Sequence, residues 1–154
     1  MKCRIIAAGT RLPAWIGAGF HEYEKRLTRP IRLELKEIAL STRHADVERA
    51  RNREGEAMLQ ALRRDDHVVA LEVGGRWMST EQLAQWLQQR LALGTDIAFL
   101  IGGPDGLAAA CRARAALQWS LSPLTFPHGL VRIMLAEQLY RAASLIAGHP
   151  YHRA

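Results

Sequence analysis

The stretch from Trp119 to His128 (WSLSPLTFPH) constrains the fold of this 154-residue chain more than any other. Pro123 and Pro127 stand four residues apart, and each proline lacks an amide donor and fixes its own φ. Neither a strand nor a helix can therefore contain both, and residues 122–127 are expected to form a shaped loop. A strand pattern precedes this loop, and a long apolar helical run from Gly129 to Ala147 follows it. In α/β folds, strand-to-helix turns of this kind hold small ligands through main-chain groups.

The helix after the loop carries an arginine in an unusual position. At 100° per residue, Arg132 falls in the same apolar stripe as Leu135 and Leu139. It also lies in the first turns, where the helix dipole disfavours a cation, so it needs an anion nearby. Two alternatives are open: Arg132 meets the anion of a ligand or substrate, or it reaches solvent or pairs with a structural carboxylate. Further along, Glu137 and Arg141 are spaced i,i+4 and are predicted to form an ordinary surface pair.

Composition favours one soluble domain spanning residues 1–154, with 49% hydrophobic and 23% charged residues. No apolar stretch approaches the length of a transmembrane helix, and the chain begins without a signal-peptide pattern. Cys3 and Cys111 are far apart and form no CxxC or Cys/His cluster. We therefore expect a cytoplasmic protein with no membrane partner, no disulfide framework and no metal site.

The net charge of +6 comes mostly from arginine, a side chain suited to phosphate contacts and to stacking on bases. A polyanionic partner such as RNA is one interpretation. The alternative is a coding bias that enriches arginine and alanine together. Charge alone does not decide between them.

Strand and helix patterns alternate along the chain. Strands are expected at residues 2–8, 31–39, 67–73, 95–101 and 116–121, and helices between them, with Gly74-Gly75 as a turn after the third strand. This alternation predicts an α/β fold, a parallel sheet with helices on both faces. The turn after the first strand has only Gly9, so the glycine-rich fingerprint of a Rossmann-type dehydrogenase is missing and that class is disfavoured.

A second candidate ligand loop, Gly102-Gly103-Pro104-Asp105-Gly106, follows the fourth strand. Adjacent glycines allow a ligand to approach the backbone closely. The loop lacks the GK[ST] of a phosphate loop, so binding of a nucleoside triphosphate is not expected. A plain Pro-Asp-Gly turn explains residues 104–106 well, but it explains the two preceding glycines less well.

The last helix and the tail indicate a further partner. Leu130, Met134, Tyr140 and Leu145 lie opposite the core stripe, so the helix is apolar on nearly every side and predicts a subunit interface. The tail ends in an aromatic ring, an imidazole and a guanidinium, at residues 151–153. Such groups stack on a base, move a proton and hold a phosphate, although a terminus can also simply fray.

In combination, four segments resemble the pseudouridine N3-methyltransferases of the SPOUT superfamily. They are residues 101–107 (IGGPDGL), 119–128, 130–142 (LVRIMLAEQLYRA) and 149–153 (HPYHR), and the resemblance extends over the whole chain. It implies a C-terminal trefoil knot, S-adenosylmethionine bound in that knot, and a homodimer whose active site uses both chains. It also implies a substrate pseudouridine in 23S ribosomal RNA, methylated at N3 on the assembled ribosome.

The resemblance also implies site residues, carried over position by position. The cofactor contacts fall at the ends of the three late strands, on Leu71, Gly102, Gly103, Leu121, Ser122, Pro123, Leu124, Thr125 and Phe126. His152, Tyr151 and Arg132 are the catalytic candidates, with His152 as general base because an imidazole titrates near neutrality. Arg153 and His128 are candidates for substrate contact, although His128 can also be a helix-start residue without a catalytic part. The alternative from another class is an RNA-binding module without catalysis, which has no reason to bind S-adenosylmethionine.

Overall fold

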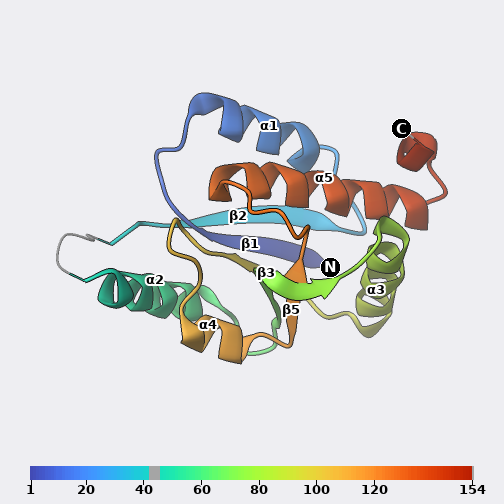
Figure 1. The fold of residues 1–154 in the computed structure, drawn as a ribbon. Coiled ribbons are helices and arrows are strands. Elements are labelled where there is room, and N and C mark those ends of the chain that lie inside the picture. Colours follow the sequence, from blue (N-terminus) through green and yellow to red (C-terminus); the bar gives the residue numbers. More distant parts are fainter. Residues whose placement is uncertain (42–45, 154) are drawn as a thin grey trace.

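Five parallel strands form the centre of the molecule (Figure 1). The computed structural model describes residues 1–41 and 46–153, except for the side chain of His152. The strands are β1 (Lys2–Ala8), β2 (Arg32–Ile38), β3 (His67–Trp77), β4 (Ile97–Ile101) and β5 (Leu117–Ser120), in the order β2-β1-β4-β3-β5. The helices are α1 (Ala14–Glu24), α2 (Val47–Ala61), α3 (Thr80–Leu93), α4 (Ala109–Arg114) and α5 (His128–Ile146), followed by the short 3₁₀ helix η1 (Pro150–Arg153).

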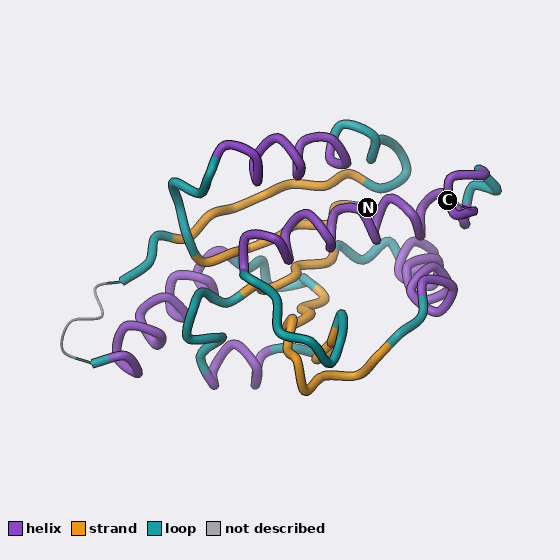
Figure 2. The backbone as a smooth tube through the Cα atoms, turned by 45° about the horizontal axis from the view of Figure 1, so that its top comes forward, coloured by secondary structure: helices purple, strands orange, loops and turns teal. Residues whose placement is uncertain are grey.

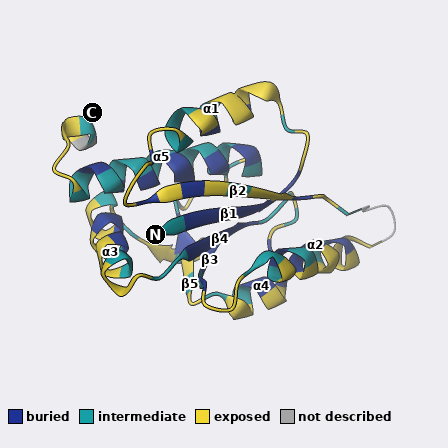
Figure 3. Ribbon diagram, turned by 180° about the vertical axis from the view of Figure 1, so that it is seen from behind, coloured by how far each residue is buried: buried dark blue, intermediate teal, exposed yellow. Residues whose placement is uncertain are grey.

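Both faces of the sheet are covered, because parallel strands need crossover connections that lie on the faces. Side chains alternate along each strand, so one strand contributes to two cores. In β4, Phe99 packs with α1, α3 and α5 on one face, whereas Leu100 packs with α2 and α4 on the other. Figure 3 shows these buried strands between exposed helix surfaces. The predicted α/β fold with helices on both faces is confirmed.

β3 is longer than the sequence analysis predicted. Gly74-Gly75 does not turn the chain; the strand continues to Trp77 after a register shift between Leu71 and Arg76 in its pairing with β5. A Cβ atom on Gly75 would lie 2.7 Å from the carbonyl carbon of Gln118 in β5. The glycine is therefore required by a close approach of two backbones, which is one reason for glycine in a strand.

The apolar surface of α5 is partly covered within the chain. Figure 2 shows α5 running beside α1, with α3 near its C-terminal part. Glycines allow the close approach to α1: a Cβ atom on Gly129 would lie 2.4 Å from Cδ1 of Ile16, and one on Gly19 would lie 2.8 Å from Cδ1 of Ile133. Tyr140 and Leu145, predicted to face a second subunit, pack partly against the chain's own core.

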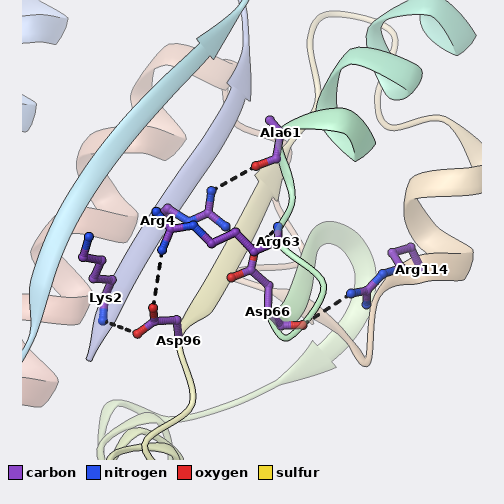
Figure 4. Close-up of polar contacts among 7 residues, drawn as sticks. All are labelled: Lys2, Arg4, Ala61, Arg63, Asp66, Asp96 and Arg114. Atoms are coloured by element: carbon purple, nitrogen blue, oxygen red, sulfur yellow. Dashed lines mark hydrogen bonds and ion pairs between the residues drawn. The ribbon is translucent and has the colours of Figure 1, made fainter.

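The edge of the sheet where the strands begin is closed by charged groups (Figure 4). The buried guanidinium of Arg4, in β1, pairs with the buried carboxylate of Asp66 and donates to the carbonyl of Ala61 at 3.0 Å. Asp96, just before β4, accepts from the backbone amide of Lys2 at 2.8 Å. These pairs tie the segments that begin β1, β3 and β4 to one another, and they lie at the edge opposite the strand ends that hold the candidate ligand loops.

Two helical glycines provide a matched test of this packing. A Cβ atom on Gly55 of α2 would lie 2.6 Å from Cβ of Ala108 and 3.3 Å from Sγ of Cys111, whereas one on Gly17 of α1 would have no neighbour within 4 Å. Gly55→Ala is expected to lower the free energy of unfolding by about 1–2 kcal/mol, because overpacking outweighs the gain in helix propensity. Gly17→Ala should raise it by up to about 1 kcal/mol. Urea unfolding measures both, and equal effects of the two substitutions would contradict the close contact at Gly55.

Candidate cofactor site

A cavity of about 660 Å³ lies at the carboxyl ends of β4 and β5 and beside the middle of β3, where the register of β3 shifts; the three strands are neighbours in the sheet. Parallel strands end at the same edge, so loops distant in sequence meet there. Its volume falls within the range of small-molecule sites. The lining residues are Leu71, Glu72, Val73, Ile101, Gly102, Gly103, Pro104, Gly106, Leu107, Trp119, Ser120, Leu121, Ser122, Leu124, Thr125, Phe126, Pro127, His128 and Val131.

The structure gathers eight of the nine predicted cofactor residues around this cavity. They are Leu71, Gly102, Gly103, Leu121, Ser122, Leu124, Thr125 and Phe126; Pro123 is not in the lining. His128, a candidate for substrate contact, lines the cavity as well. Arg132, Tyr151 and Arg153 do not, and the side chain of His152 lies outside the described part of the chain.

The predicted proline loop is present between β5 and α5, and two serines fix its path. The hydroxyl of Ser120 donates to the carbonyl of Ser122 at 2.9 Å, and the hydroxyl of Ser122 accepts from the amide of Leu124 at 3.0 Å. Leu124 itself is 66% exposed. Side chains of the loop thus hold its own main chain in place, which leaves other backbone groups free to meet a ligand.

The glycine loop after β4 combines a turn with a close contact. The amide of Gly106 donates to the carbonyl of Gly103 at 3.0 Å, and Gly106 has a φ of 79°. A Cβ atom on Gly102 would lie 2.5 Å from the carbonyl carbon of Gly106. Gly102 is therefore required by the folding of its own loop, which a plain turn motif did not explain.

Glu72 is the only Asp, Glu, Lys or Arg among the described residues that line the cavity. Its Oε1 lies 3.8 Å from Nη1 of Arg112, which is not in the lining. A polyphosphate ligand needs cations or a glycine-rich phosphate cradle, whereas a carboxylate favours a ligand that carries positive charge. Glu72 was not predicted as a site residue, although its place directly after the apolar run of a buried strand was an available signal.

Arg132 has a structural carboxylate as its partner, the second of the two alternatives left open. Its side chain is 2% exposed, and Nη1 donates to Oε2 of Glu37 in β2 at 2.7 Å. Nη2 donates to the carbonyls of Ala8 and Gly9, at 3.1 and 2.7 Å. These acceptors pair both terminal nitrogens of a cation near the start of a helix without any ligand anion, whereas the buried Nε has no hydrogen-bond partner. Arg132 is linked to the site through Gly9. Its Nη2 binds the carbonyl of Gly9, and a Cβ atom on Gly9 would lie 3.3 Å from Nε2 of His128, which lines the cavity.

The C-terminal tail lies along α5, away from the cavity of its own chain. Tyr151 contacts Glu137 and Tyr140, while His128 at the other end of the helix lines the cavity. At 1.5 Å per residue, Tyr140 is about 18 Å further along the helix than His128. The tail and the cavity of one chain are therefore separate in this structure.

The parallel sheet, with a cavity beside three adjacent strands, defines an α/β protein with a candidate small-ligand site at this edge of the sheet. The chain belongs to the SPOUT methyltransferase family: it matches the family described as "Predicted SPOUT methyltransferase" over residues 1–152. Two relatives carry the name ribosomal RNA large subunit methyltransferase H. The one from Hahella chejuensis is 53% identical and the alignment covers 99% of each chain. The one from Xanthomonas campestris pv. campestris is 54% identical, with 100% of each chain covered.

Two solved structures support the fold. A probable methylase family protein from Haemophilus influenzae matches with a TM-score of 0.59 and 13% identity, covering 97% of this chain and 69% of that one. A probable methyltransferase from Bordetella pertussis matches with a TM-score of 0.57 and 14% identity, covering 91% and 95%. At such low identity the similarity concerns the fold alone.

Residues 1–41 and 46–153 contain no group of three or more His, Cys, Asp or Glu residues placed to hold a metal ion. None of the helices in that part of the chain is both long and apolar enough to cross a membrane.

Arg132→Met is expected to lower the free energy of unfolding by about 3 kcal/mol, because two buried carbonyls and Glu37 lose their donor. Glu37→Gln should cost about 1 kcal/mol or less, because Glu37 is 40% exposed and glutamine still offers an acceptor. Urea unfolding of both variants checks the difference. An unchanged stability of Arg132→Met, together with a loss of cofactor affinity, would instead assign Arg132 to ligand binding.

Proposed function

We propose that the chain is an S-adenosylmethionine-dependent methyltransferase that modifies N3 of a pseudouridine in 23S ribosomal RNA, on the assembled ribosome. The observation that carries this proposal is the cavity, in which eight of the nine residues suggested by the family resemblance come together. The relatives named for large-subunit ribosomal RNA methylation are more than half identical over essentially the whole chain. The net charge of +6 suits an RNA substrate.

The residues around the cavity fit this cofactor. When bound, S-adenosylmethionine supplies a methyl group that its sulfonium already activates. Gly102, Gly103 and the backbone of residues 121–126 would hold the adenosine part through amides and carbonyls. Glu72 would attract the positive charge of the cofactor, and the absence of Lys and Arg from the described lining disfavours a polyphosphate nucleotide at the same place.

The substrate side of the site is proposed to come from a second copy of the chain. The tail of one chain lies along α5 and away from its own cavity, so in a homodimer it can approach the partner's cavity instead. Leu130 and Met134 remain partly exposed on α5 and are candidates for the contact between subunits. The C-terminal trefoil knot implied by the family stays a prediction.

His152 is proposed to take the N3 proton of the pseudouridine, because methyl transfer to that nitrogen requires its removal and an imidazole titrates near neutral pH. Arg153 is exposed and suits a phosphate of the RNA. His128 lines the cavity and would contact the substrate base. Arg132 would act through its hold on Ala8 and Gly9 rather than by touching the reacting groups.

Mass mapping of 23S ribosomal RNA tests the function. RNA from a strain lacking this gene should lose one methyl group at a single pseudouridine, and the purified protein with S-adenosylmethionine should restore it on isolated ribosomes. If the protein binds ribosomal RNA but calorimetry detects no binding of S-adenosylmethionine, the chain is an RNA-binding module and the proposal is wrong.

Filling the cavity provides a test by substitution. Leu71→Trp places an indole in the cavity lining and should weaken binding of S-adenosylmethionine at least tenfold, a loss of about 1.4 kcal/mol or more. Leu93→Trp makes the same change at a residue that is 67% exposed and outside the lining, and it should leave affinity unchanged. Calorimetry measures both, after thermal melting has confirmed that each variant is folded. Full affinity in Leu71→Trp would place the cofactor elsewhere.

A further inference from the structure

The C-terminal tail folds back onto α5 and meets it through Tyr151. The chain reverses at Gly148, which has a φ of 69°, and the amide of His149 donates to the carbonyl of Ser144 at 2.8 Å. The ring of Tyr151 then lies 4.6 Å from the ring of Tyr140, centroid to centroid. Distances in this range are typical of aromatic pairs that stabilise each other.

Two charged residues complete this contact. The guanidinium carbon of Arg141 lies 5.0 Å from the centroid of the Tyr151 ring, within the range of a cation–π interaction. The hydroxyl of Tyr151 donates to Oε1 of Glu137 at 3.3 Å. We call Glu137, Tyr140 and Arg141 the tail seat.

The tail seat is itself held in place. Nε of Arg141 donates to Oε1 of Glu137 at 2.8 Å, so the predicted i,i+4 pair is present. Both residues of the pair also contact Tyr151. Arg26, just beyond α1, lies over the rings of Tyr23 and Tyr140, at 5.6 and 5.7 Å from their centroids. The seat is therefore fixed from both helices.

The hydroxyl of Tyr151 is poorly suited to act as a base. Burial, followed by the interactions with Tyr23 and Glu137, raises its pKa to about 12. At neutral pH the phenol keeps its proton, so it can donate a hydrogen bond but does not accept a proton from a substrate.

We propose that Tyr151 is a positioning residue, and that the tail seat fixes the tail so that the exposed Arg153 is presented to the ribosomal RNA. This inference rests on the proposed function for the identity of the RNA. It changes the role of Tyr151 from a group that touches the substrate to an anchor. It also gives Glu137, Tyr140 and Arg141, none of which lines the cavity, a part in the reaction.

The test compares Tyr151→Phe, Tyr151→Ser, Tyr140→Leu and the double variant Tyr140→Leu/Tyr151→Ser. Methylation of ribosomes should stay within about threefold in Tyr151→Phe, because the ring contacts remain, and fall about tenfold in Tyr151→Ser and Tyr140→Leu. The double variant should lose no more methylation activity than the less active of the two single variants, because both changes break the same contact. Affinity for S-adenosylmethionine should be unchanged in all four.

Amide hydrogen exchange of the C-terminal peptide provides a readout without RNA. It should speed up in Tyr151→Ser and Tyr140→Leu and stay slow in Tyr151→Phe. The control Trp15→Leu removes an aromatic ring that is 60% exposed at the opposite end of α1, and it should leave this exchange unchanged.

Three results would overturn the proposal. The first is a loss of about a hundredfold or more in Tyr151→Phe with normal tail exchange, because such a loss is typical of a group that transfers a proton. The second is wild-type exchange in Tyr140→Leu, and the third is additive losses in the double variant. If the wild-type protein transfers no methyl group to ribosomes, the proposed function fails, while tail exchange still decides whether the seat holds Tyr151.

Discussion

The buried guanidinium of Arg132 joins three parts of the chain that the sequence keeps far apart. It binds the carbonyls that end β1, the carboxylate of Glu37 on β2 and, through its own backbone, the first turns of α5. These contacts fix where α5 begins, and therefore where the loop between β5 and α5 ends. The start of α5 in turn determines the position of His128 and of one wall of the cavity. A charge buried in this way is costly to leave unpaired, so the arrangement tolerates little variation.

The cavity is a consequence of strand order. β4, β3 and β5 are neighbours, so three lining segments that are separate in the sequence, at residues 71–73, 101–107 and 119–131, form one site. Glycines and serines shape these loops, and most of the lining residues are apolar or glycine. Among the described lining residues, Glu72 alone supplies a carboxylate, and it gives the cavity its negative charge. A site of this kind distinguishes ligands by shape and by charge sign more than by a large set of side chains.

Local patterns in the sequence predicted much of this arrangement. The alternation of strands and helices and the proline loop at residues 122–127 depend on neighbouring residues or on simple sterics, and both are confirmed. The features that were missed or left open depend on partners distant in sequence. The continuation of β3 through Gly75 requires knowledge of Gln118, the neutralisation of Arg132 requires Glu37, and the contact of Arg26 with Tyr140 requires the packing of α1 on α5. No periodicity in the sequence contains these pairings.

The two ends of α5 meet different parts of the molecule: its first residue, His128, lines the cavity, while its second half contacts the tail. A straight helix keeps such groups at a constant separation and a constant angle, 1.5 Å and 100° for each residue between them. One residue more or fewer between Val131 and Glu137 would turn the seat by about 100° around the helix axis relative to the cavity. The length of α5 therefore fixes the distance and the angle between the cavity and the tail seat.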